Sequence, residues 1–568
     1  MNRFHWPLAS QCFLQTLNDE MSVKKHAIQL ALLFCGLTVP LGTAHPLAAP
    51  QTPQKPPQKK DLFGDPLPRY SLVRLGSIQK TNVLPAAYHN LPTVSGIAIS
   101  PDGKQIATRG EPSDPKRRRK IRIWNSATGK LELTLVGHAS RITDFSFSPD
   151  SQTIAVGYAN HPLGWQIWNL KTHKVIQTFD GGRGKGFYLE NKSQFAVVAE
   201  SKPNDVVRVH DLRTGREVRR FLVDPSYRFV FSPKAERILT VQSRGHSEMR
   251  LVELRSGRTL MTTHVKGAEP TALALSPDFR SFAAADITRD EKGFRVYRIS
   301  LWEIATARFV LTKPAHKGRI LAMQFSPDGR LLATASTDRS VKLWATTTGK
   351  LVASLEGHQK PVASLAFSAD GAFLASGSFD KTALVWNLTQ LRKPTATTQI
   401  IDADRLNELW FELASETPGK AYRALGQIDL QRTETVPFFK KRMHEFLVPV
   451  ESVRIQNLIA QLDHPDFRVR QQATLALKKI RKIAKPVLLK IIKTTDSAEV
   501  RQRIRSILSG LSDLPRFSIS DIRRMWRMIH LAGWIGGEDG RDILGEIIEE
   551  FPNPQVVNEA RKTLKRLR

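Results

Sequence analysis

The stretch of the chain that comes closest to a recognisable chemical motif is GGRGKG, which begins at Gly181. Glycines ahead of a lysine cradle phosphates when the loop ends in Gly-Lys-Ser or Gly-Lys-Thr and opens a helix. This stretch has neither the ending nor a helical pattern after it, so a loop between strands is the favoured interpretation. The Gly-x-Ser-x-Gly, His-Glu-x-x-His and Cys-x-x-Cys-His motifs are also absent. We therefore predict no catalytic, cofactor-binding or metal-ligating residue, no cofactor, and a protein that is not an enzyme.

Binding chemistry is better represented, in a run of basic side chains within PSDPKRRRK, residues 112–120. Such a run creates a local positive field that attracts an acidic partner. A tolerated surface loop is the competing interpretation. A nuclear-import signal is a third interpretation, but the secretory leader described below argues against it. The candidate partner-binding residues are Lys116, Arg117, Arg118, Arg119 and Lys120.

The whole chain is basic, with 85 Lys and Arg against 53 Asp and Glu, a net charge of +32 and a pI near 10.3. This balance favours an acidic partner or surface, through a long-range attraction that salt weakens. Solubility alone is the alternative explanation. The 41% apolar and 24% charged composition is that of a globular protein, and 568 residues exceed one compact core, so we expect two or more domains.

The only two cysteines, Cys12 and Cys35, lie in the first few dozen residues. Their position excludes a disulfide framework, a cysteine zinc site and a cysteine nucleophile in the body of the protein. It also suits a chain that meets an oxidising compartment.

A repeat of about 42 residues organises the middle of the chain. Seven apolar strands end in tryptophan or a substitute, at spacings of 44, 42, 42, 50, 42 and 42 residues. Within most units a Ser-Pro-Asp type of turn joins two short alternating strands, so each unit is a small antiparallel sheet that cannot bury both faces alone. The seven strands are IRIWN at Trp124, WQIWN at Trp168, VRVHD at His210, MRLVE at Val252, ISLWE at Trp302, VKLWA at Trp344 and ALVWN at Trp386.

This repeat resembles the WD40 family, most fully in EGHQKPVASLAFSADGAFLASGSFDKTALVWN, residues 356–387. The resemblance covers residues 70–390 and implies an all-β propeller of seven blades around a central channel. It further implies that a histidine bonds to an aspartate in a later tight turn, and that the bonds continue through Ser or Thr to the indole. The tryptophans are then structural. The marks expected in this role are Trp124, Trp168, Trp302, Trp344, Trp386, His138, His316, His358, Asp338 and Asp380.

Only the last two units hold the full set of marks. His138 lacks a clear turn aspartate, and the third and fourth units carry His210 and Val252 in place of tryptophan. We therefore expect apolar packing to hold the middle blades. The resemblance also implies that residues 71–79, SLVRLGSIQ, close the ring beside the Trp386 strand. Two insertions, residues 112–120 and 287–298, should project from the face that most often receives partners in this family.

Beyond the linker at residues 391–403 the apolar period changes from 2 to 3.6, so residues 404–568 are predicted to be α-helical. Residues 458–480 resemble a HEAT-type repeat, with a generic helical bundle as the alternative. We expect one helical face from Val469 through Ala473, Leu477 and Ala484, and a helix start at Pro486.

The N-terminus, residues 1–49, reads as a presequence with a secretory signal at its centre, residues 21–44. Lys24 and Lys25 precede an apolar run that is shorter than the roughly 20 residues of a membrane-spanning helix, so we expect cleavage near Ala44 or Ala49 and no stable transmembrane anchor. Residues 50–69 form a Pro- and Lys-rich linker. We expect export to the periplasm or exterior, with an intracellular location as the alternative.

These observations predict a non-enzymatic scaffold that binds a protein partner, most readily an acidic one, through loops on one face of the propeller. It resembles large exported bacterial WD40 proteins with helical extensions. Two alternatives stay open. One is an exported propeller hydrolase or lyase with a site at the channel mouth, and the other is polyanion or nucleic-acid binding by the basic helical tail.

Overall fold

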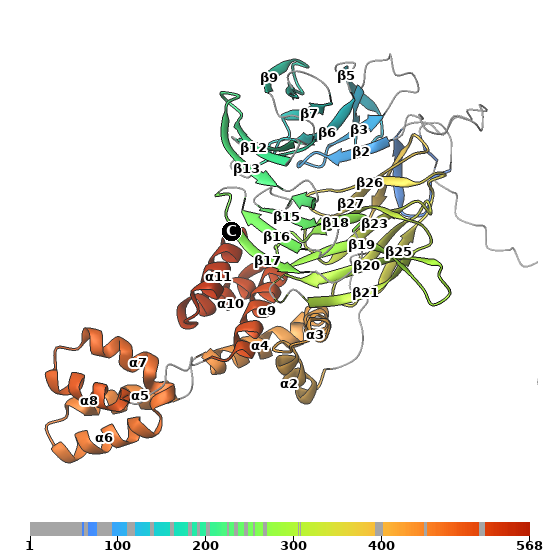
Figure 1. Cartoon of the computed structure of the whole chain (residues 1–568). Coiled ribbons are helices and arrows are strands. Elements are labelled where there is room, and N and C mark those ends of the chain that lie inside the picture. Colours follow the sequence, from blue (N-terminus) through green and yellow to red (C-terminus); the bar gives the residue numbers. More distant parts are fainter. Residues whose placement is uncertain are drawn as a thin grey trace, which may run out of the picture. The chain divides into compact units, whose positions relative to one another are not determined.

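The structure is a computed structural model in which most of the chain beyond residue 59 is described. The described residues are 60–61, 66–75, 94–110, 120–136, 141–159, 164–179, 184–189, 194–199, 205–223, 227–231, 237–242, 248–253, 256–264, 270–304, 306, 308–391, 401–447, 451–509 and 517–567. They contain a β-propeller followed by a helical region (Figure 1).

The strands of the described residues form seven sheets of four antiparallel strands each, so the predicted seven-bladed propeller is confirmed. Blades one to four are β2 (Val94–Ile99), β3 (Gln105–Gly110), β4 (Lys120–Asn125) and β5 (Leu131–Val136); β6 (Ile142–Phe147), β7 (Thr153–Tyr158), β8 (Trp165–Asn169) and β9 (Val175–Phe179); β10 (Gly184–Tyr188), β11 (Gln194–Ala199), β12 (Asp205–Asp211) and β13 (Glu217–Val223); and β14 (Tyr227–Phe231), β15 (Arg237–Gln242), β16 (Glu248–Glu253) and β17 (Thr259–His264).

The last three blades complete the ring. They are β18 (Ala272–Leu275), β19 (Ser281–Arg289), β20 (Arg295–Glu303) and β21 (Arg308–His316); β22 (Ile320–Phe325), β23 (Leu331–Ser336), β24 (Val341–Ala345) and β25 (Leu351–Leu355); and β26 (Val362–Phe367), β27 (Phe373–Ser378), β28 (Ala383–Asn387) and β1 (Ser71–Leu75).

The ring closes through the N-terminal strand, as predicted. β1 pairs antiparallel with β28, with Ser71 opposite Trp386 and Leu75 opposite Ala383. Val73 and Leu75 are buried and pack with apolar residues of blades seven and one. Since β1 supplies the outer strand of the last blade, residues far apart in sequence hold the ring shut. Residues 76–79 of the predicted strand lie outside the described residues.

The Ser-Pro-Asp turns fold by local hydrogen bonds. In blade six the Ser326 hydroxyl donates to the Asp328 carboxylate at 2.5 Å and accepts from the Leu331 amide at 2.9 Å. Gly329 follows with a φ of +71°, a left-handed conformation that glycine adopts without a steric cost. The same serine-to-aspartate bond recurs in the other turns of this type that are described, at Ser100, Ser148, Ser276 and Ser368.

The middle blades pack through apolar and aromatic side chains. His210, which replaces tryptophan in blade three, is buried and stacks on Phe179 with ring centroids 4.5 Å apart. Trp165 is fully buried and lies 5.0 Å from Phe195, at the junction of blades two and three. In blade four the half-buried Val252 packs against an apolar core that blade three shares with Ile238 of blade four. These contacts agree with the apolar packing expected from the missing tryptophans.

The rest of the described chain is α-helical, as predicted. Its elements are α2 (Ala403–Glu412), α3 (Pro418–Leu430), α4 (Arg432–Leu447), α5 (Glu451–Ala460), the 3-10 turn η1 (Gln461–Asp463), α6 (Phe467–Lys479), α7 (Arg481–Thr494), α8 (Ala498–Leu508), α9 (Ile519–Ile535), α10 (Gly537–Glu550) and α11 (Pro554–Leu567).

Two details of the helical prediction are wrong. The face expected to run unbroken from Val469 to Ala484 is interrupted at Ile480, where α6 ends and α7 begins. Pro486 does not start a helix, because α7 begins at Arg481, five residues earlier. Ala473, Leu477 and Ala484 are nevertheless all buried in one core. The apolar spacing therefore predicted the buried positions correctly, although it did not predict the helix boundary.

The helices divide into two groups with separate cores. α5 to α8 bury residues such as Leu462, Leu488 and Ile504 among themselves, and we call them the basic module for the charge described below. α2 to α4 and α9 to α11, the docked helices, share one core with blades five and six, in which Trp410 and Leu425 join Leu301 and Val310. The HEAT-like stretch thus falls within the basic module, and the chain leaves the docked helices at α4 and returns to them at α9.

Candidate interaction surfaces

The predicted marks of blade six lie in a continuous chain of hydrogen bonds. His316 Nδ1 lies 2.9 Å from Asp338 Oδ2, and His316 Nε2 lies 2.8 Å from Thr334 Oγ1. The Trp344 indole donates to the same hydroxyl at 2.9 Å. Burial opposes ionisation of Asp338, but hydrogen bonds from His316 and Ser340 outweigh it and hold the pKa of the carboxyl well below its usual range.

Blade seven repeats this arrangement. His358 Nδ1 lies 2.8 Å from Asp380 Oδ2, and both His358 Nε2 and the Trp386 indole meet Ser376 Oγ, at 2.9 and 2.8 Å. Burial again opposes ionisation, but hydrogen bonds led by that from His358 lower the pKa of Asp380 to about 2. The His316 and His358 side chains are 0% and 1% exposed, so no substrate reaches them, and both sets hold the blades together.

The other three predicted tryptophans are buried or half-buried, and the blades use them differently. The half-buried Trp124 donates to Thr108 at 2.7 Å, whereas Trp302 is buried and stacks on Phe282 with nearly parallel rings 5.8 Å apart. Trp168 is half-buried and packs on the core shared by blades one and two. His138 lies outside the described residues.

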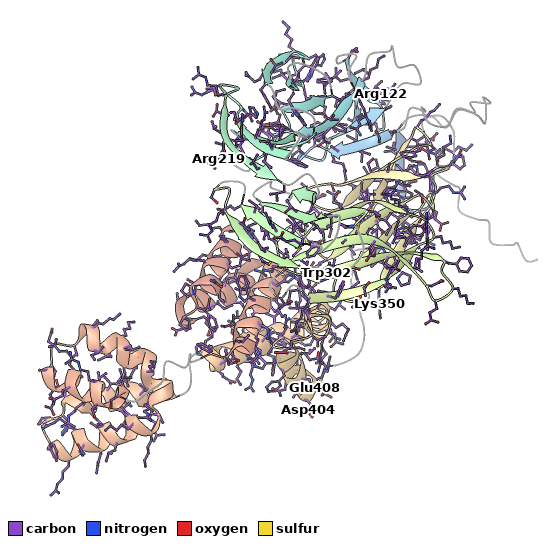
Figure 2. The ribbon with its side chains drawn as sticks, viewed as in Figure 1. Arg122, Arg219, Trp302, Lys350, Asp404 and Glu408 are labelled. Atoms are coloured by element: carbon purple, nitrogen blue, oxygen red, sulfur yellow. The ribbon has the colours of Figure 1, made fainter. Side chains whose placement is uncertain are left out.

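The candidate partner-binding run is largely outside the described residues, which include only Lys120. That residue is exposed at the start of β4. Further basic side chains are exposed on the blades, among them Arg122 on β4 and Arg219 on β13 (Figure 2).

The second predicted insertion, residues 287–298, extends β19 and β20 into a long hairpin. The strands pair up to Arg289 opposite Arg295, and the Asp290 carboxylate accepts from the backbone amides of Lys292 and Phe294 to form the turn. Phe294 is 68% exposed beside this turn. The hairpin therefore presents an aromatic side chain among exposed charged side chains of both signs.

The basic module carries most of the charge imbalance of the helical region. Residues 451–509 contain thirteen Lys and Arg against five Asp and Glu, whereas residues 403–447 contain seven of each and residues 519–567 eight of each. Lys478, Lys479, Lys490 and Lys493 of the module are exposed. The excess charge thus lies on helices that are not packed into the core of the docked helices.

A buried ion pair fastens the docked helices to the propeller. Glu303 of blade five accepts two hydrogen bonds from Arg527 of α9, both at 3.0 Å, and the two side chains are 7% and 3% exposed. Arg527 also donates to the backbone oxygens of Leu413 and Ser415, at the end of α2. Sequence reasoning missed this pair, because each residue alone resembles an ordinary surface charge.

α9 is shaped for this contact. A capping box between Ser518 and Asp521 starts the helix, and Gly536, with a φ of +65°, follows its end. Arg527, His530 and Trp534 lie three and four residues apart, so they share the face that meets the propeller. His530 Nε2 lies 2.9 Å from the Asp278 carboxylate of blade five.

Two further properties concern the part of the chain that the structure describes. None of its helices combines the length and the apolar character needed to cross a membrane. It also contains no group of three His, Cys, Asp or Glu side chains placed to hold a metal ion.

Comparison with known proteins agrees with this geometry. Residues 129–161, 307–345 and 349–387 match the model of the WD domain, G-beta repeat. The last two stretches end in the blades that hold the complete His–Asp–Trp chains. Within the ring of blades, these three stretches are similar to WD40 repeats.

Individual relatives match through parts of their length. The chain is 27% identical over 185 residues to the WD repeat-containing protein SL1-17 of Schistosoma mansoni, covering 32% of this chain and 58% of that protein. It is 37% identical over 254 residues to the Periodic tryptophan protein 2 homolog of Dictyostelium discoideum, covering 45% and 21%. It is 30% identical over 274 residues to the Nuclear distribution protein PAC1 of Arthroderma otae, covering 44% and 58%. The chain thus spans about a fifth to three fifths of these eukaryotic relatives.

Proposed function

We propose that the chain is a non-enzymatic interaction scaffold that binds an acidic protein partner. WD40 propellers typically serve as scaffolds for protein interactions, because a rigid ring holds its loops in fixed positions. The observation that carries the proposal is the separation of charge: the helices used for docking are balanced, whereas the basic module is strongly positive. Such a surface accelerates encounters with an acidic partner.

The propeller contributes a second contact, through Lys116, Arg117, Arg118, Arg119 and Lys120. To test it, the full chain and a variant with all five residues replaced by Gln are used as bait for affinity capture, and the retained proteins are identified. We expect the wild type to retain an acidic protein that the variant loses. Equal retention of every captured protein by both baits would contradict a role for this run.

A second candidate is polyanion binding by the basic module. Phe467 is 60% exposed, and the guanidinium carbons of Arg470 and Arg503 each lie 5.7 Å from the centre of its ring. An exposed aromatic ring between cations is the kind of platform on which a base of single-stranded nucleic acid stacks.

Salt dependence tests this second candidate. Binding of a single-stranded oligonucleotide is measured for the wild type and for a variant with Lys478, Lys479, Lys490 and Lys493 replaced by Gln. The slope of log affinity against log salt should become shallower by about 0.7 for each phosphate that the variant no longer neutralises. The control replaces four exposed cations of the docked helices, Lys441, Arg561, Lys562 and Lys565, and should keep the wild-type slope. Identical slopes for all three proteins would rule the module out as the nucleic-acid contact.

The enzymatic alternative, a hydrolase or lyase site at the channel mouth, requires acidic or histidine side chains that converge there. The two best-formed His–Asp pairs of the described residues are instead buried within blades. No observation on the described residues favours this alternative over the scaffold.

We propose export as the location, on the pattern of residues 21–49, and with it the resemblance to exported bacterial WD40 proteins. N-terminal sequencing of the mature protein, together with cell fractionation, tests the proposal. We expect a cleaved chain outside the cytoplasm that begins after Ala44 or Ala49. An uncleaved chain in the cytoplasm would support the intracellular alternative.

A further inference from the structure

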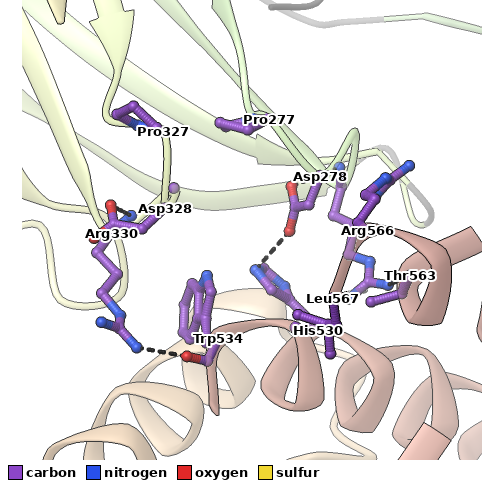
Figure 3. A pocket seen from close by; sticks show the side chains of 13 residues that line it. Pro277, Asp278, Pro327, Asp328, Arg330, His530, Trp534, Thr563, Arg566 and Leu567 are labelled. Atoms are coloured by element: carbon purple, nitrogen blue, oxygen red, sulfur yellow. Dashed lines mark hydrogen bonds and ion pairs between the residues drawn. The ribbon is translucent and has the colours of Figure 1, made fainter. Parts of the chain in front are cut away.

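A cavity of about 270 Å³ lies where the propeller meets the docked helices (Figure 3). Its walls come from two neighbouring Ser-Pro-Asp turns, one in blade five and one in blade six, and from α9 and α11. Asp278, Arg280, Trp534 and Arg566 are among the residues that line it.

Both turns carry an arginine two residues after the aspartate, Arg280 and Arg330. At the same position the other turns of this type have Lys104, Gln152, Glu236 and Ala372, so arginine occurs only in the two turns that line the cavity. Packing of the helices explains one of them, since Arg330 donates to the Asp429 carboxylate at 3.0 Å and to the Trp534 backbone oxygen at 2.8 Å.

Docking satisfies the Arg280 guanidinium only in part. Its side chain is 9% exposed and donates to the Thr563 hydroxyl at 3.2 Å, while its Nε is buried with no acceptor among the described residues. Burial, opposed by the attraction of Asp278 and Glu559, lowers the pKa of this guanidinium. A buried cation of this kind is costly unless a counter-charge is supplied.

Arg566 adds a second positive charge to the same cavity. Its guanidinium lies over the Phe279 ring, 4.9 Å from the centroid, and is close enough to oppose the charge of Arg280. Among the described residues, neither arginine has a carboxylate within ion-pair distance. The Asp278 carboxylate, which also lines the cavity, is instead paired with His530 of α9 at 2.9 Å. The cavity therefore holds two like charges that form no ion pair with a described residue, although Asp278 and Glu559 attract Arg280 from beyond ion-pair distance.

The opposite side of the cavity is apolar and narrow. A β-carbon on Gly329 would lie 3.7 Å from Trp534 Nε1 and 3.8 Å from Pro277 Cδ, so the indole, the proline ring and the glycine converge on one slot. Figure 3 shows Trp534 below the blade-six turn, with Pro327 and Pro277 above the cavity. Flat faces of this kind accept a planar ring.

We propose that this cavity binds a small aromatic anion, with its carboxylate or phosphate group between Arg280 and Arg566 and its ring against Trp534. The cavity volume suits a single ring with one charged substituent, because pockets that bury drug-sized ligands have volumes of about 300 to 1,000 Å³ and this cavity lies just below that range. The ligand would contact blade five, blade six, α9 and α11 together, so its binding would stabilise the docked state of the helices.

The test uses the full chain labelled with 5-fluorotryptophan, in which the Trp534 signal is assigned by its loss in Trp534→Phe. Benzoate, phenyl phosphate, inorganic phosphate and benzyl alcohol are titrated separately to about 10 mM, which detects millimolar affinities. We expect benzoate or phenyl phosphate to shift the Trp534 signal and raise the melting temperature. Inorganic phosphate and the neutral alcohol should bind at least tenfold more weakly.

Two variants separate binding from packing. Arg566→Gln should weaken the affinity for the active anion at least tenfold. Lys562→Gln, which removes an exposed charge from the same helix, should leave it unchanged. A Trp534 signal in Arg566→Gln that matches the wild type without ligand shows that the helices remain docked. The proposal is overturned if neither aromatic anion shifts the Trp534 signal, if benzyl alcohol binds as well as benzoate, or if the two variants bind alike.

Discussion

The buried ion pair between Glu303 and Arg527 offers a quantitative test of how the helices are held on the propeller. Replacing Arg527 by Met keeps the length of the side chain but leaves the Glu303 carboxylate, 7% exposed, without its partner. It also removes the donor to two backbone oxygens at the end of α2, which Arg527 meets at 2.7 Å each. Breaking a buried pair by removing one partner costs about 3 to 5 kcal/mol.

The loss of this ion pair should lower the free energy of opening α9, because the pair connects this helix to blade five. Hydrogen exchange of the α9 amides measures the opening free energy directly. We expect Arg527→Met to lower it by about 3 to 5 kcal/mol, with a smaller loss for Glu303→Gln, which keeps an acceptor for the guanidinium.

A surface pair on the same helix provides the control. Arg523 donates to Glu416 at 3.0 Å, but the glutamate side chain is 70% exposed, so the pair should contribute only about 0 to 1 kcal/mol. Arg523→Met should therefore change the exchange of α9 little. If Arg527→Met and Arg523→Met have equally small effects, the ion pair does not hold the helices and the reasoning is refuted.

Three further predictions concern blade seven, ring closure and helix packing. The pKa of Asp380 is lowered from 3.8 to about 2, so its ionised form stabilises the fold above about pH 4. The stability lost in Asp380→Asn, measured by chemical denaturation, should therefore shrink as the pH falls from 4 towards 2. A difference in stability that does not change with pH would contradict this. Val73→Asp should speed exchange of the β28 amides by burying an unpaired charge in the closing strand, and unchanged exchange would show that β1 does not close the ring. Gly419→Ala should destabilise the protein by about 1 to 3 kcal/mol, because the new β-carbon would lie 2.5 Å from a backbone oxygen of β21. Gly545→Ala, whose β-carbon would have no atom within 4 Å, should stabilise it by about 0.5 to 1 kcal/mol. Melting curves that rank the two variants in the opposite order would refute the packing of α3.

Much of the propeller was predictable because its signals are local and repeated. The Trp344 and Trp386 strands each follow their turns within one unit, so spacing alone located the blades, and resemblance to the family located the closing strand β1. The contact between Glu303 and Arg527 was not predictable, since the residues are 224 positions apart and nothing in either neighbourhood marks burial.

The helical region shows where periodicity stops being informative. The spacing of Ala473, Leu477 and Ala484 identified a buried face, but the same spacing continues across the break at Ile480, so the boundary between α6 and α7 was missed. Spacing also could not show that α9 returns to the helices preceding α5. That arrangement depends on contacts between distant helices and blades.

The scaffold proposal is tested most directly by titrating the acidic protein recovered by affinity capture against the full chain at increasing salt. The wild type should bind with an affinity that falls steeply as salt rises. The variant with Lys116 to Lys120 replaced by Gln and the variant with Lys478, Lys479, Lys490 and Lys493 replaced by Gln should each bind more weakly and with less dependence on salt. The control with Lys441, Arg561, Lys562 and Lys565 replaced should match the wild type. An affinity that is insensitive to salt and equal in all four proteins would contradict the account.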